Sequence, residues 1–441
     1  MFRNLTRRIF RQRPVRSIGH AAAYAVSAVF LLSVPQMVSA QGGADFEQPP
    51  VLKVTQLIPA KLLTGQGFRV EEQVPTDGVM GTYTLIADEE TFGENAGTYQ
   101  VRSREMAELR LSEIPAIIKL DETSKTGTFV KSMASTAVQP LESAGNMLLN
   151  PVDTVTGLPS GVGRLFDRVG MGADRLWDTA TTSDQGGLER TKEVAEETGT
   201  LTRNILGYEQ ERRDLAKKLG VDPYTTNPVL SKKLDEITTT AFRAHVAVNA
   251  AISVFVPASI ILTGVRTTDN LVWDTPRADL VVRVEEKLEN LKIAPAQKSA
   301  FMNNAAIPLS LQVAIVENLD RLANVRGRSQ IVTLVGSVAT ESQSRFLATS
   351  LRMLVEYHEK NKPLTAVAAP GPLVGRDRDG ALIMPAPVDY VSWTERVASF
   401  ATSPAFLAMP QRTVWLAGLM SPRAKQGFEA NGWTIHDGKE P

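Results

Sequence analysis

The hydrophobic residues of this chain follow two different spacings, and each spacing predicts a different kind of element. Apolar and polar positions alternate over residues 68–74, 82–86 and 98–101, which is the period of a β-strand. Residues 75–78, with a proline at the start and a glycine at the end, form a turn sequence between the first two strands. We therefore predict a small antiparallel β meander in the first part of the chain.

From residue 104 the spacing becomes that of a helix. Leu111, Ile114 and Ile118 recur at i, i+3 and i+7, and we expect Pro115 to kink or split this helix. Three more apolar stripes follow over 276–361, and the last of them allows a helix that runs unbroken to its end. This region predicts a large helical body.

The last part of the chain returns to strands. Asp379-Gly380 lies between two short apolar runs and predicts a β-hairpin. Ser421-Pro422 is an N-cap followed by proline at the first helical position, between apolar runs at 413–417 and 433–435. The sequence therefore predicts a strand–helix–strand unit at the end of an α+β protein that is predominantly α-helical.

The first 40 residues have the pattern of an export signal. Six arginines precede the first acidic residue, an uncharged run of 14 residues covers 21–34, and Val38-Ser39-Ala40 offers a cleavage site before Gln41. As a helix the run would extend about 21 Å, which is short for a hydrocarbon core of about 30 Å. We expect a cleaved signal peptide, although an uncleaved anchor is the alternative.

The arginine pair of this leader resembles the twin-arginine export motif in Thr6-Arg7-Arg8-Ile9-Phe10. Arg11 and Gln12 depart from that motif, so the sequence leaves both the twin-arginine route and the ordinary route open. With either route the mature chain is expected in the periplasm, or secreted, from a bacterium.

Charge and cysteine content exclude several classes of function. The chain has 48 basic and 48 acidic residues, so removing the six arginines of the leader leaves a formal charge of −6. A mildly acidic chain gives no sign of nucleic-acid binding, which needs a clustered basic face. The absence of cysteine excludes disulfides, thiolate zinc sites and cysteine nucleophiles.

An apolar, glycine-rich loop over 150–172 provides the candidate binding residues. Loops are usually polar and exposed, so an apolar one must pack on the protein's own core, a membrane surface or a partner. Glycines there allow close packing, and a nearby cation and aromatic ring offer contacts; the candidates are Gly157, Gly161, Gly163, Arg164 and Phe166.

The longest uncharged run of the mature chain covers 246–265, with 14 apolar residues among 20. At this length a membrane span must be considered. Pro257 and the alanine- and valine-rich composition favour a buried pair of short helices instead.

No established catalytic or metal-binding motif emerges. Ser160 is one position late for a G-x-S-x-G elbow, and no phosphate-binding glycine loop is complete. His245, His358 and His436 are far apart and predict no metal site, and we expect His358 on a solvated helix face. Two carboxylate pairs, Asp174 with Asp178 and Asp153 with Asp167, keep acid–base chemistry open.

These patterns divide the chain into a signal peptide, a linker with the meander, a helical domain with the apolar loop, a helical bundle and a small α/β unit. The corresponding ranges are 1–40, 41–103, 104–272, 273–362 and 363–441. Two functions follow: an exported non-enzymatic protein that binds an envelope protein, a lipid or a membrane surface, or an exported hydrolase whose site is assembled from distant segments. A helical protein that inserts into membranes through 246–265 is a third. The sequence sets no cofactor, ligand identity or oligomeric state.

Overall fold

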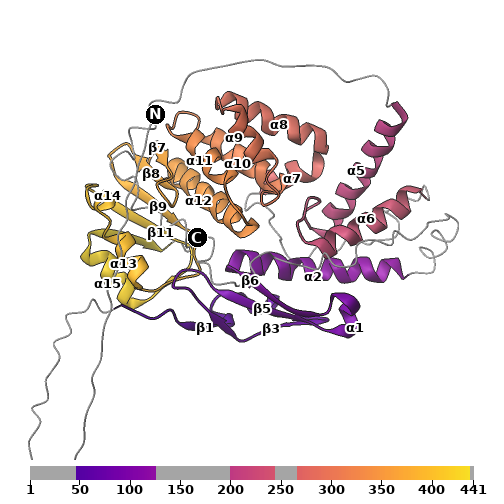
Figure 1. Cartoon of the computed structure of the whole chain (residues 1–441), viewed down its shortest axis with the longest axis horizontal. Coiled ribbons are helices and arrows are strands. Elements are labelled where there is room, and N and C mark those ends of the chain that lie inside the picture. The colour runs from indigo at the N-terminus through magenta and orange to yellow at the C-terminus, as the bar shows by residue number, and fades with distance from the viewer. Residues whose placement is uncertain (1–45, 126–198, 244–265, 438–441) are drawn as a thin grey trace, which may run out of the picture. The chain divides into compact units, whose positions relative to one another are not determined.

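The computed structural model describes residues 46–125, 199–243 and 266–437. All of them belong to one of the two compact units into which the chain divides, Phe46–Pro441. This unit combines several sheets with a larger number of helices (Figure 1). The predicted α+β class with a mainly helical body is therefore confirmed.

The predicted meander is present as a four-stranded antiparallel sheet. Its strands are arranged in the order β2-β3-β5-β6, with bounds Thr64–Gly65, Phe68–Val70, Thr82–Ala87 and Gly97–Arg102. The run that we predicted as one strand over 68–74 divides, because the chain changes partner after Val70. Its second half, β4 (Gln73–Pro75), pairs with β1 (Val51–Lys53) instead of with β5.

Two short connections complete this part of the chain. Strand β1 is joined to β2 through the 3₁₀ turns η1 (Val54–Gln56) and η2 (Ala60–Leu62). Strand β5 is joined to β6 through the helix α1 (Glu89–Phe92) and the 3₁₀ turn η3 (Gly93–Asn95). The long helix α2 (Arg104–Ser124) follows the sheet and continues through Pro115, so of the predicted kink or split the split does not occur. A proline inside a helix costs about 3 kcal/mol, and burial of Ile114, Ala116 and Ile117 around it offsets that cost.

The helical body is confirmed. Its helices are α5 (Gly199–Leu219), α6 (Pro228–Arg243), α7 (Arg266–Asp274), α8 (Arg277–Asn290), α9 (Pro295–Met302), α10 (Leu309–Arg321), α11 (Arg328–Gly336) and α12 (Glu341–Lys360). The unbroken helix up to residue 361 is wrong, because α11 and α12 are separate. Thr340 caps α12 and exchanges hydrogen bonds with Gln343, which starts a new helix there.

The C-terminal part forms one five-stranded sheet, in the order β13-β11-β9-β8-β7. The strands are β7 (Leu364–Ala368), β8 (Val374–Asp377), β9 (Leu382–Ala386), β11 (Arg412–Leu416) and β13 (Trp433–Asp437). The predicted hairpin joins β8 to β9, with Gly380 at φ +84°. The predicted strand–helix–strand unit is β11, α15 (Pro422–Ala430) and β13, and its strands are parallel.

Helices cover both faces of this sheet (Figure 1). Trp415 on β11 meets Tyr357 of α12 edge to face, at 5.4 Å between ring centroids. Trp433 on β13 points to the other face, where it packs on α13 (Glu395–Ala401), α14 (Pro404–Leu407) and α15. A small parallel pair, β10 (Tyr390–Val391) and β12 (Leu419–Met420), lies beyond the ends of β9 and β11.

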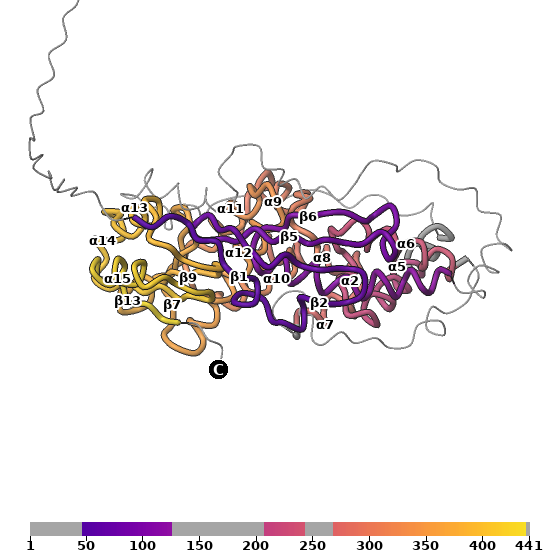
Figure 2. The backbone as a smooth tube through the Cα atoms, turned by 90° about the horizontal axis from the view of Figure 1, so that it is seen from below, coloured from indigo at the N-terminus to yellow at the C-terminus, as the bar shows by residue number. Residues whose placement is uncertain are grey.

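The buried apolar residues form three cores. The largest joins helices α7–α12 to the C-terminal sheet, the second lies between α2, α5 and α6, and the third lies between α2 and the N-terminal strands. Figure 2 shows the N-terminal strands extending from the C-terminal sheet to α6, with α2 behind them. Helix α2 therefore contributes to two cores, and the space where the three cores approach one another is the candidate site.

Candidate functional site

The predicted binding residues Gly157, Gly161, Gly163, Arg164 and Phe166 lie outside the described residues, as do both carboxylate pairs and the run 246–265. Of the helices that the structure describes, none combines the length and apolar character that a membrane span requires.

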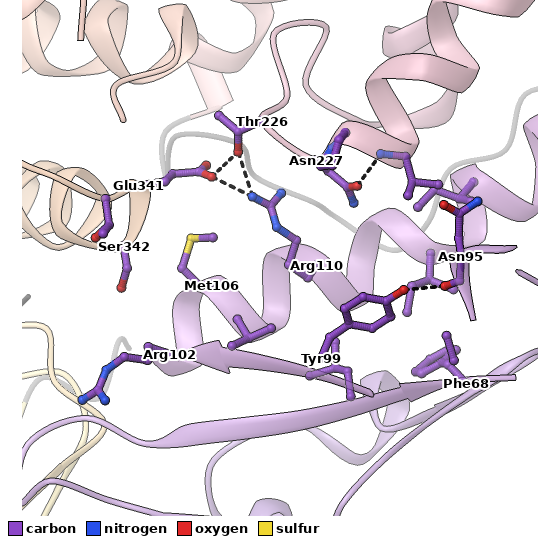
Figure 3. A pocket seen from close by; sticks show the side chains of 18 of the residues that line it. Phe68, Asn95, Tyr99, Arg102, Met106, Arg110, Thr226, Asn227, Glu341 and Ser342 are labelled. Carbon is purple, nitrogen blue, oxygen red and sulfur yellow. Dashed lines mark hydrogen bonds and ion pairs between the residues drawn. The ribbon is translucent and has the colours of Figure 1, made fainter. Parts of the chain in front are cut away.

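A cavity of about 430 Å³ lies in the described part of the molecule. It lies between the β5–β6 sheet, α2, the start of α6, the loop before α10 and the start of α12 (Figure 3). At about 30 Å³ for each group the size of a water molecule, it has room for roughly 14 such groups. This is within the size range of small-molecule sites.

Apolar side chains form most of the wall. On α2 the lining residues Met106, Arg110, Ile114 and Ile117 follow the helical period, so one stripe of the helix faces the cavity. On β6, Tyr99 and Val101 alternate with outward-facing polar residues and line the opposite side. The other apolar lining residues are Phe68, Leu85, Ile86, Ala87, Phe92, Pro228, Val229, Ala305, Ala306 and Ala339.

One end of the cavity is polar, and Arg110 is its centre (Figure 3). The guanidinium donates to Glu113 at 2.8 Å through Nη1, and to Glu341 at 2.7 Å and Thr226 at 2.8 Å through Nη2. Arg345 donates to the other oxygen of Glu341 at 2.8 Å. We call these four charged residues, Arg110, Glu113, Glu341 and Arg345, the ion-pair cluster.

Glu341 and Arg110 keep their charges over a wide pH range. Burial by itself would raise the pKa of Glu341, but Arg345, Arg110 and the Thr226 hydroxyl lower it to about 2. Burial acts to lower the pKa of Arg110, yet the carboxylates of Glu113 and Glu341 raise it above its ordinary value. Neither group can exchange a proton near neutral pH.

The loop between α5 and α6 holds this polar end in place. Thr225 donates to Glu113 at 2.7 Å, and the Asn227 amide donates to the same carboxylate at 2.9 Å. Asp222 anchors the other end of the loop by accepting hydrogen bonds from Ser310 of α10 and from the Tyr224 amide. Burial raises the pKa of Asp222 to about 6, against the lowering effect of those hydrogen bonds.

The described histidines, His358 and His436, do not line the cavity. His358 does not lie on a solvated face as we expected; it is half-buried, and its Nδ1 accepts from the Leu364 amide at 2.8 Å. His436 is exposed, and its ring stacks on that of Trp415 with 4.2 Å between the ring centroids. Among the described residues, no three acidic or histidine side chains gather as a metal would require.

A second location merits comparison, because α/β units usually bind ligands beyond the carboxyl ends of their parallel strands. Here that place is filled. Asp389, which follows β9, is buried and accepts from the amides of Gly81 at 2.9 Å and Arg104 at 2.9 Å and from the Tyr83 hydroxyl at 3.1 Å.

The end of β11 is filled in the same way. Glu47 accepts from the Trp393 amide and from the Ser421 hydroxyl at the start of α15, both at 2.5 Å. The chain also passes so closely that a Cβ at Gly418 would lie 2.0 Å from the Val388 carbonyl oxygen. The cavity beside these contacts, lined by Ala386, Val388 and Met420 among others, measures about 30 Å³, which is about the volume of one water molecule.

The cavity residues were missed at the level of sequence, although two signals were available. The stripe Met106, Arg110, Ile114 and Ile117 has a charged residue within an apolar face, which is unusual unless the charge is paired. The capping pair Thr340 and Gln343 locates the start of α12 and hence Glu341.

Comparisons with models of protein families, with curated proteins and with solved structures found no match to this chain.

Proposed function

We propose that this protein is an exported, non-enzymatic binding protein that holds one small, largely apolar molecule in the cavity beside α2. The observation that carries the proposal is the combination of apolar walls with an ion-pair cluster whose charged groups are bonded to one another. A lipid fragment or another amphipathic molecule of the cell envelope belongs to this class of ligand.

The cavity supports binding because its walls are apolar and its volume of about 430 Å³ lies within the range of small-molecule sites. Transfer of an apolar molecule from water into such a space gains about 25 cal/mol for each Å² of apolar surface removed from water. Arg110 and its partners Thr226 and Glu341 sit at one end (Figure 3), and a polar end beside apolar walls is an arrangement that orients an amphipathic ligand.

The chemistry of the lining favours binding over catalysis. An acid–base catalyst needs a group whose pKa lies near the operating pH, whereas the pKa of Glu341 is about 2. Nucleophilic catalysis needs a base within hydrogen-bond reach of the nucleophile. Ser342 lines the cavity, but neither His358 nor His436 does.

The binding proposal is tested with N-phenyl-1-naphthylamine, an uncharged fluorophore whose emission rises in apolar surroundings. The protein is expected to bind one equivalent of it. Ala306→Phe and Ala87→Phe place a ring in the cavity from opposite walls, and each should weaken binding at least tenfold. Ala408→Phe, at an exposed alanine outside the lining, is the matched control.

Retention of the fold in each variant is checked by thermal unfolding, so that lost binding is not confused with lost structure. Stoichiometric binding that both ring-bearing variants leave unchanged would place the probe elsewhere and end the proposal.

Export is part of the same proposal and rests on the leader described above. The full chain expressed in a bacterium is fractionated, and the N-terminus of the product is sequenced. We expect a chain that begins at Gln41 in the periplasmic or secreted fraction; an intact chain in the cytosol contradicts it.

A further inference from the structure

We infer that the cavity selects uncharged amphipathic molecules over carboxylates of the same chain length, because the ion-pair cluster at its polar end carries no net charge. This inference deepens the proposed binding function and rests on it.

The cluster contains two cations and two anions, and they satisfy one another. Glu341 accepts from Arg345 with one oxygen and from Arg110 and Thr226 with the other. Glu113 accepts from Arg110 and Asn227 with one oxygen and from Thr225 with the other. The carboxylate oxygens and both Nη atoms of Arg110 are therefore engaged before any ligand arrives.

A carboxylate ligand at this end would have to take Arg110 away from one of its partners. That exchange leaves the Glu113 or Glu341 carboxylate buried without its counter-ion, and breaking a buried ion pair in this way is strongly unfavourable. Both carboxylates are shielded by the protein: Glu113 is 1% exposed, and the Glu341 side chain is 10% exposed.

An uncharged head group meets no such barrier. A hydroxyl, ester or amide needs only one or two hydrogen bonds, and the hydroxyl oxygen of Thr226 has a second lone pair beside the one that faces Arg110. Ser342 lines the same end and brings a hydroxyl that can both donate and accept (Figure 3).

Arg102 is the other cation of the lining and the natural rival for a carboxylate. Its guanidinium donates to Asp77 at 2.8 Å, and in Figure 3 it points away from the Arg110 end. Arg396 also lies 3.8 Å from the Asp77 carboxylate, so Asp77 keeps a cationic neighbour when Arg102 is replaced. If Arg102 holds a ligand acid, an Arg102→Gln variant binds that acid more weakly.

The experiment compares 1-decanol with decanoate at pH 8, where the acid is ionised. Each is titrated against the protein loaded with N-phenyl-1-naphthylamine. We expect the alcohol to displace the fluorophore at a concentration at least tenfold lower than decanoate does. Equal potency of the two compounds, or stronger displacement by decanoate, overturns the inference. If Arg102→Gln then removes the displacement by decanoate, Arg102 is the group that holds the acid.

The matched variants change one charge at a time. Glu113→Gln keeps the shape of the side chain and leaves the cluster with one excess positive charge, so decanoate should gain at least tenfold relative to the alcohol. Glu90→Gln removes the same charge from an exposed residue of α1 and should change neither value. An unaltered preference in Glu113→Gln also overturns the inference.

Glu341→Gln provides a second test of the same charge balance if the Glu113 variant does not fold. If the proposed binding function is wrong, the result differs: neither decanol nor decanoate displaces the fluorophore from the unaltered protein. The inferred selectivity is then also wrong.

Discussion

The cavity beside α2 and the carboxyl ends of the parallel strands are two places where this fold could hold a ligand, and they are built in opposite ways. At the strand ends, Asp389 and Glu47 receive backbone amides and hydroxyls from distant parts of the chain. At the cavity the charged groups bond to one another and the apolar walls leave a space. At the strand ends the carboxylates join distant parts of the chain by hydrogen bonds. At the cavity they pair with arginines, and the charges of the pairs cancel.

This contrast shows that the position of a site within a fold class is not enough to identify it. Open α/β sheets usually bind ligands beyond the carboxyl ends of their strands. Here the N-terminal segment and the start of α2 occupy that position, and the unfilled space lies between this N-terminal part and the helical body. The contacts of individual side chains decide which place is free.

The largest effect is expected from Asp389→Ala. The change leaves the Gly81 and Arg104 amides and the Tyr83 hydroxyl without their acceptor, and buried unsatisfied groups cost about 1–3 kcal/mol each. We expect a loss of about 4 kcal/mol in the free energy of unfolding, measured by urea denaturation. Asp437→Ala, at an exposed residue, serves as control; an equal loss there would remove the special role of Asp389.

The next effect concerns pH and the polar end of the cavity. Folding lowers the pKa of Glu341 from 4.5 to about 2, so its stabilising contribution is present above pH 4.5 and is lost as the pH falls towards 2. At about 1.4 kcal/mol for each pKa unit, the loss amounts to about 3 kcal/mol. Glu341→Gln should flatten this acid limb in urea denaturation at a series of pH values, and a limb that persists contradicts the assignment.

Asp222 is expected to act in the opposite direction. Its folded pKa of about 6 lies above its ordinary value of 3.8, so its contribution to stability is present below pH 3.8 and is lost as the pH rises through 6. The loss is of the order of 3 kcal/mol. In the same series, Asp222→Asn should abolish the decline between pH 4 and pH 7, and a decline that survives must come from another group.

A smaller effect separates two residues one turn apart on α2. Leu111 is 2% exposed and packs in the core against the N-terminal strands, whereas Ile114, in the same core, also lines the cavity. Truncation to alanine removes packing contacts only where neighbours exist. We expect about 3 kcal/mol for Leu111→Ala and about 1–2 kcal/mol for Ile114→Ala in urea denaturation. Equal costs would mean that the space beside Ile114 is closed.

The smallest effect is expected at the other filled location. Glu47→Gln keeps one acceptor oxygen but loses the charge that faces the Trp393 amide and the start of α15. We expect about 1 kcal/mol of destabilisation by thermal or urea unfolding, since a hydrogen bond to a charged acceptor is only moderately stronger than a neutral one. A loss as large as that of Asp389→Ala would make the two carboxylates equivalent.

Much of the fold was predictable because local patterns determine local structure. The alternation over 82–86 and 98–101 identified strands β5 and β6, and Asp379-Gly380 identified the β8–β9 hairpin. The errors arose where tertiary contacts overrule the local pattern. Helix α2 continues through Pro115, where buried residues on both sides hold it in place. The chain changes strand partner after Val70. The candidate binding residues chosen in 150–172 remain a prediction, since they lie outside the described residues.

The sequence by itself determined the class of the fold, the absence of cysteine chemistry and much of the order of strands and helices, because spacing and turn residues act over a few positions. Only the tertiary structure decided where the open space lies. The cavity wall is assembled from β5, β6, α2 and α12, and Arg110 meets Glu341 across 231 positions of the chain. Pairing between charges so distant depends on how the cores pack, and no local pattern specifies that.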